Sequence, residues 1–95
     1  MTEMHKHTPR PEAERKALIS RLHRIQGQLA GIERMIEADQ YCGDILIQTS
    51  AAQKALQSVA QMILDTHMKT CVKEQILEGN DQVIDELSGL IRKLK

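Results

Sequence analysis

The chain has 95 residues, the length of one small domain, and it lacks Phe and Trp, so its core has to be aliphatic. A chain of this size is marginally stable alone, and we expect association between copies to bury further surface. The net charge of zero gives no overall signal for nucleic acid, and no apolar run approaches the ~20 residues that span a bilayer.

Residues 1–11 predict a flexible arm, and residues 12–95 predict a single all-helical domain. The arm is polar and lacks the apolar stretch of a signal peptide, so we expect a cytoplasmic protein. Pro11 suits the start of a helix. His5 and His7 could bind metal, although histidine-rich arms are common without that role.

A first helix is expected over about residues 12–38, because apolar residues recur there at alternating spacings of 4 and 3. This heptad stripe is typical of helices that pack lengthwise on partners. The stripe comprises Leu18, Leu22, Ile25, Leu29, Ile32 and Ile36.

Basic side chains concentrate in the same part of the sequence. From Met4 to Arg34 there are seven basic and three acidic residues, and the rest of the chain is acidic. A local basic surface can bind phosphate on a neutral protein. The alternative is a solvated helix face.

The pattern breaks at residues 39–43, which predicts a turn, and a second helix is expected from Cys42 or Asp44 to about Leu77. Gly79 fits the position after a helix end, and Asn80 or Asp81 can cap a third, short helix. No segment of the sequence predicts a strand.

Three possible metal donors share one stripe of the second helix. His67 and Cys71 are four residues apart, and Cys42 falls within about 40° of them at 100° per residue. A chance pair of a half-buried His and a packed Cys is the alternative for His67 and Cys71 alone. In a cytoplasmic chain, two cysteines favour metal binding or redox chemistry over a disulfide.

The spacing of these donors indicates a site shared between chains. Cys42 and His67 are 25 residues apart, which is ~37 Å on a continuous helix. Two antiparallel chains related by a two-fold axis near Leu56 would bring Cys42 of one chain to the His67–Cys71 end of the other. Two thiolates and an imidazole suit three-coordinate Cu(I), and Zn(II) with one exogenous ligand also fits.

Several motifs resemble the CsoR/RcnR family of bacterial metal-sensing repressors. They are Arg-Leu-x-Arg-Ile-x-Gly-Gln from Arg21 to Gln28, the Tyr41–Cys42 pair and Ala51–Ala52. The resemblance covers roughly Leu18 to Leu94. It implies a three-helix protomer, an antiparallel dimer and a dimer-of-dimers tetramer that binds double-stranded operator DNA without a helix-turn-helix motif.

The resemblance also implies roles for single residues. Cys42, His67 and Cys71 match the Cu(I) ligands of the copper-sensing branch, in which Cu(I) binding releases the DNA. Tyr41 matches a tyrosine that lies around the metal ligands in that branch, and Glu86 matches a third-helix glutamate if one residue is missing near Gly79. The implied DNA contacts are Arg21 and Arg24, and their plausible neighbours are Lys54, Arg15, Lys16 and Arg10.

Other functions fit the residues less well. Nickel and cobalt sensors of the family have a His where Cys71 stands, and persulfide sensors lack the His at position 67. A Cys–His enzyme would need an orienting group and an oxyanion hole that the sequence does not provide. A passive helical interaction module is the remaining alternative.

Overall fold

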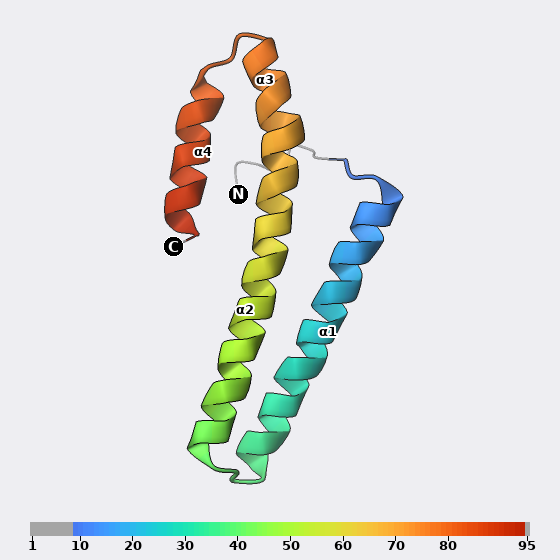
Figure 1. The fold of residues 1–95 in the computed structure, drawn as a ribbon, viewed down its shortest axis with the longest axis vertical. Coiled ribbons are helices and arrows are strands. Elements are labelled where there is room, and N and C mark those ends of the chain that lie inside the picture. Colours follow the sequence, from blue (N-terminus) through green and yellow to red (C-terminus); the bar gives the residue numbers. More distant parts are fainter. Residues whose placement is uncertain (1–8, 95) are drawn as a thin grey trace. The chain divides into compact units, whose positions relative to one another are not determined.

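The computed structural model describes residues 9–94, and all regular structure in that range is helical. This confirms the predicted all-α, three-helix protomer. The elements are α1 (Glu12–Glu37), α2 (Cys42–His67), the π turn η1 (Met68–Val72), α3 (Lys73–Leu77) and α4 (Gln82–Lys93) (Figure 1). Since η1 joins α2 to α3 without a break, the predicted second helix, ending at about Leu77, is observed with one irregular turn inside it.

The chain divides into two compact units, which meet in the sequence between Gln61 and Met62. The boundary lies inside α2. None of the helices in residues 9–94 is both long and apolar enough to cross a membrane.

The first unit is a hairpin of α1 and the greater part of α2. Its buried residues are Leu18 and Ile25 on α1 and Ala52 and Val59 on α2. Each pair is seven residues apart, which places both members on one face of a helix. Three other residues of the predicted stripe are exposed in the single chain: Leu22, Leu29 and Ile36.

A Schellman turn ends α1 and leads into α2. The amide of Gln40 donates to the Met35 carbonyl at 3.0 Å, and the amide of Asp39 donates to the Ile36 carbonyl at 3.1 Å. Asp39 has a φ of 52°, a left-handed conformation that a side chain disfavours. The sequence predicted the turn but not which residue adopts this conformation.

A second Schellman turn lies in the second unit, between α3 and α4. Asn80 donates its amide to the Gln75 carbonyl at 2.9 Å, and Gly79 has a φ of 86°, as its predicted position after a helix end requires. The predicted cap is not made. Asp81 occupies the N-cap position of α4 without a side-chain capping bond, and the Asn80 side chain donates to Gln75 Oε1 instead.

The core of the second unit is small. Val72 of η1 and Val83 of α4 are its buried residues, and α4 packs against η1. The π turn is therefore the part of the long helix that α4 contacts. A change of backbone in η1 would act directly on this packing.

Candidate metal centre

Cys42 is the first residue of α2, and its free thiol is exposed. The preceding residue, Tyr41, is 75% exposed, and its ring covers the Cα of Gly43. A Cβ at position 43 would collide with that ring. Gly43 thus leaves room for the Tyr41 side chain beside the Cys42 backbone.

His67 and Cys71 lie together in the second unit. His67 is the last residue of α2, Cys71 is the fourth residue of η1, and both are half-buried. Cys71 is not part of a disulfide. A thiol and an imidazole that are four residues apart along one helical segment can act on the same ion.

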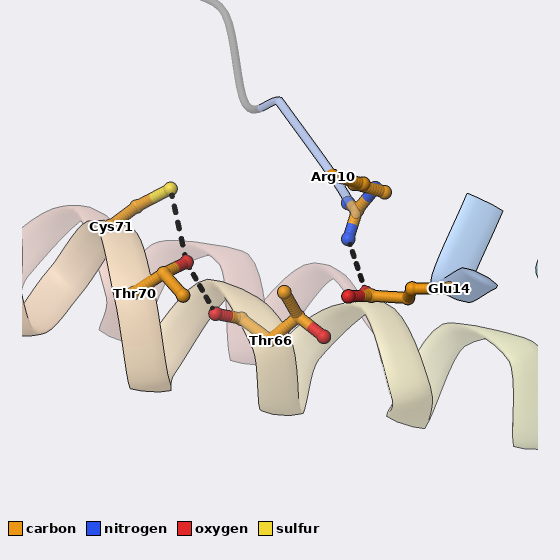
Figure 2. A network of polar contacts seen from close by, with 5 residues as sticks. All are labelled: Arg10, Glu14, Thr66, Thr70 and Cys71. Atoms are coloured by element: carbon orange, nitrogen blue, oxygen red, sulfur yellow. Dashed lines mark hydrogen bonds and ion pairs between the residues drawn. The ribbon is translucent and has the colours of Figure 1, made fainter. Parts of the chain in front are cut away.

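The residue before Cys71 has a hydroxyl group that lies close to the Cys71 sulfur. The Oγ1 of Thr70 donates to the Thr66 carbonyl at 2.7 Å and lies 3.6 Å from the Cys71 Sγ (Figure 2). Sequence reasoning did not single out Thr70, because a polar residue on an exposed helix face is unremarkable without the backbone around it.

The π turn has no clear signal in the sequence. A threonine that bonds to the carbonyl four residues earlier can bend a helix. Thr49, however, makes the same bond to the Ile45 carbonyl at 2.8 Å within regular α2. A threonine at this spacing therefore does not by itself predict a π turn, which often marks a functional segment.

Within residues 9–94, no three His, Cys, Asp or Glu side chains gather in a way that could hold a metal ion. The structure thus brings His67 and Cys71 to one segment but does not assemble all three predicted donors in a single chain. Glu86, the other predicted neighbour of the site, is an exposed residue of α4. His5 and His7 lie outside the described residues.

The predicted DNA-contacting residues differ in their surroundings. Arg10 is 19% exposed and forms an ion pair with Glu14 at 2.9 Å (Figure 2), and Arg15 forms a more exposed pair with Glu12 at 3.2 Å. Lys16 and Lys54 are exposed. Two of the six basic side chains are therefore already matched with carboxylates.

Arg21 and Arg24 are exposed and line a surface pocket of the first unit. Ile25, Gln28 and Ala55 complete the lining. The Oε1 of Gln28 is buried and has no hydrogen-bond partner among the described residues. Sequence reasoning did not select Gln28 as a site residue, although it closes the Arg21–Gln28 motif.

Comparison with known proteins gives a consistent result. A family model described as metal-sensitive transcriptional repressor matches residues 14–93. The chain is 43% identical over 81 residues to the copper-sensing transcriptional repressor CsoR of Bacillus subtilis (strain 168), covering 84% of this chain and 80% of that protein.

Two solved structures are similar as well. The copper-sensing repressor CsoR with Cu(I) from Geobacillus thermodenitrificans NG80-2 is 40% identical, with a TM-score of 0.86 and 92% of each chain covered. The nickel-responsive transcriptional regulator InrS is 33% identical, with a TM-score of 0.76 and coverage of 96% of this chain and 100% of that one.

Proposed function

The chain belongs to the family of metal-sensitive transcriptional repressors, and from this premise we propose that it is a Cu(I)-responsive repressor. Its apo form binds double-stranded operator DNA, and Cu(I) binding releases the DNA. Membership of a repressor family confirms the prediction of a regulator rather than an enzyme. The observation that carries the choice of metal is the donor set of two cysteines outside any disulfide and one imidazole.

The donor set fits Cu(I) better than the other metals considered. Thiolates are soft ligands that favour Cu(I), whereas structural Zn(II) normally takes four protein ligands and iron–sulfur clusters usually take four cysteines. Nickel favours imidazole and other nitrogen ligands more than this set provides. When bound, Cu(I) joins Cys42, His67 and Cys71 into one charged centre.

The site is proposed to form between two copies of the chain. Cys42 and His67 are the first and last residues of the 26-residue helix α2, so one chain cannot bring them to the same ion. An antiparallel partner supplies Cys42 to the His67–Cys71 pair, and the two-fold axis creates a second, equal site. Tyr41 lies next to the donor Cys42, and Tyr41 and Glu86 are proposed to surround the ligands.

Exposed apolar side chains support association into a dimer of dimers. In the single chain they lie on every long helix, and they would be costly to leave in water. They include Leu22, Leu29 and Ile36 on α1, Leu46, Ile47, Leu56 and Ile63 on α2, and Ile84, Leu90 and Ile91 on α4.

Arg21 and Arg24 are proposed as the main DNA contacts, because both are exposed and line one pocket. Lys16 and Lys54 add positive charge, whereas Arg10 and Arg15 have to exchange a carboxylate for a phosphate. Most such contacts position the protein on the DNA backbone. Since the partner is genomic operator DNA, the proposed location is the cytoplasm.

Release of DNA follows from linkage between the two sites. If Cu(I) binds more tightly to a conformation with low DNA affinity, then DNA weakens Cu(I) binding by the same factor. The His67–Cys71 half of the site adjoins η1, against which α4 packs. Ligation at Cys71 can therefore change the packing of α4.

A mobility-shift titration tests this function. DNA is first selected from a random duplex library by the metal-free protein, and the complex is then titrated with Cu(I), Zn(II), Ni(II) or a persulfide donor. We expect Cu(I) to release the DNA at the lowest concentration. Release by Ni(II), Zn(II) or persulfide at lower concentrations than Cu(I) would assign a different inducer.

Two substitutions serve as controls for the titration. Cys42→Ala should still bind the selected DNA but fail to release it with Cu(I). Arg24→Ala should weaken DNA binding and reduce the slope of log affinity against log salt by about 1, as expected for one lost phosphate contact. A Cys42→Ala protein that releases DNA at the wild-type Cu(I) concentration contradicts the proposed site.

A further inference from the structure

The hydroxyl of Thr70 has two possible acceptors and one proton. The Thr66 carbonyl lies 2.7 Å from Thr70 Oγ1, and the Cys71 Sγ lies 3.6 Å from it. Carbonyl oxygen is the stronger acceptor and lies closer, so we expect the hydroxyl to favour Thr66 over Cys71 while the sulfur is a thiol. The sulfur then lies beside an oxygen that can reorient towards it.

The backbone around Thr70 makes this arrangement adjustable. Thr70 and Cys71 both lie in η1, where amides bond to carbonyls five residues back instead of four. The Thr70 hydroxyl occupies the carbonyl to which the Thr70 amide would bond in a regular helix. The side chain therefore adds a hydrogen bond to a backbone carbonyl beside the irregular turn.

We propose that Thr70 is a positioning residue for Cys71: its hydroxyl turns from the Thr66 carbonyl to donate a hydrogen bond to the Cys71 sulfur when that sulfur binds metal. This inference rests on the proposed Cu(I) site. A metal-bound cysteine is a thiolate, which accepts hydrogen bonds better than a thiol. Such a bond orients the sulfur and disperses its charge.

The consequence for the helix follows from the same movement. When the hydroxyl leaves the Thr66 carbonyl, η1 loses a side-chain hydrogen bond to its backbone. A hydroxyl bond of this kind can bend a helix, so the turn between His67 and Cys71 can then change its curvature. Because α4 packs against η1, the packing of Val72 and Val83 would adjust as well.

The test compares three variants of the full chain. Thr70→Val keeps the shape of the side chain and removes the hydroxyl, and Thr70→Ser restores a hydroxyl without the methyl group. Thr49→Val is the matched control, because Thr49 makes the same carbonyl bond at 2.8 Å in α2 but is not adjacent to a cysteine. Cu(I) affinity is measured by competition with a chromophoric Cu(I) chelator.

We expect Thr70→Val to lower Cu(I) affinity about 10-fold, the low end of the range for groups that orient a metal ligand. The near-ultraviolet thiolate-to-copper absorption should shift with it. Thr70→Ser should keep the wild-type affinity and absorption, and Thr49→Val should change neither. In the metal-free protein, the ¹³Cβ chemical shift of Cys71 should move in Thr70→Val only.

The outcomes separate this inference from the proposed function. If wild-type protein does not bind Cu(I), the proposed function fails and the role of Thr70 fails with it. If wild-type protein binds Cu(I) and Thr70→Val binds it equally well with unchanged absorption, only the role of Thr70 is overturned. A Thr70→Ser protein as weak as Thr70→Val would show that a hydroxyl at position 70 does not by itself position the sulfur, and this result would also overturn the inference.

Discussion

The proposed metal donors at the two ends of α2 have different surroundings. Cys42 begins a regular helix, and its thiol is exposed just after a turn closed by Asp39. His67 and Cys71 are half-buried at the other end, where the helix passes into a π turn. Cys42 therefore lies on regular helical backbone, whereas Cys71 lies in an irregular turn beside the Thr70 hydroxyl.

From this difference we infer that the His67–Cys71 half of the proposed site is the half whose backbone changes when the metal binds. A regular helix offers one backbone arrangement, but a π turn can exchange its hydrogen bonds with those of an α-helix. Substitutions near Cys71 should therefore alter coupling to DNA more than substitutions near Cys42 that leave the thiol intact.

The largest expected effect is complementation between the two ends. Cys42→Ala and Cys71→Ala should each lose Cu(I) binding by more than the 10–100-fold typical of groups that only orient a ligand. When the two variants are mixed and exchange subunits, each mixed dimer regains one complete site. Random pairing returns about one quarter of the wild-type sites, measured as Cu(I) bound against a competing chelator.

A second mixture controls for this recovery. Cys71→Ala and His67→Ala both alter the paired-donor end, so no mixed dimer contains an intact His67–Cys71 pair and no site should return. Recovery in this control, or its absence in the first mixture, contradicts a site built from opposite ends of two chains.

The next largest effect concerns the middle of α2, where the proposed two-fold axis pairs each end of one α2 helix with the opposite end of its partner. Leu56 is 52% exposed in the single chain. Leu56→Glu would bury a carboxylate in the dimer at a cost of several kcal/mol, which raises the dissociation constant by more than about 100-fold. Sedimentation analysis should detect smaller species.

Ser58→Glu is the matched control for that substitution. It adds the same charge about 200° around the helix, at an exposed position. We expect its assembly to resemble that of the wild type. An unchanged oligomer in Leu56→Glu would refute pairing of α2 helices near this residue.

The smallest effects distinguish the turn before Cys42 from the turn after Cys71. Gly79→Ala should destabilise the protein by about 1–2 kcal/mol, the cost of a left-handed conformation with a Cβ. Asp39→Gly should stabilise it by about 0.5 kcal/mol, because relief of the same conformation is partly offset by the freedom of glycine in the unfolded chain. Urea unfolding at fixed protein concentration measures both.

A Cβ at Gly79 meets nothing within 4 Å, so steric collision does not complicate that measurement. Equal stability of Gly79→Ala and wild type would mean that the turn after α3 does not hold its left-handed residue in solution.

The regular parts of this fold could be predicted from the sequence. Apolar spacings located the helices, and Gly79 marked the end of the second one, because both signals depend on local geometry alone. The sequence also nominates Cys42, His67 and Cys71 as metal donors, because such residues are few and chemically distinctive, and this choice stays a prediction.

The irregular parts could not be predicted. Thr70 and Thr49 make the same hydrogen bond, yet only Thr70 lies in a π turn, so the local sequence does not decide between the two helical forms. Asp39 adopts a conformation that glycine usually supplies. The ion pair of Arg10 with Glu14 depends on side-chain rotamers, and these cannot be predicted by counting charged residues in the sequence.

The π turn also means that the length of the helix and the spacing of the proposed metal donors can be changed with different effects on folding and on metal binding. It holds one residue more than an α-helical turn does. Deletion of one residue between His67 and Cys71 therefore leaves enough chain for a regular α-helix, in which the helix faces before and after η1 keep their relative orientation. The donor spacing, however, falls from four residues to three. We expect such a shortened chain to fold but to bind Cu(I) with lower affinity.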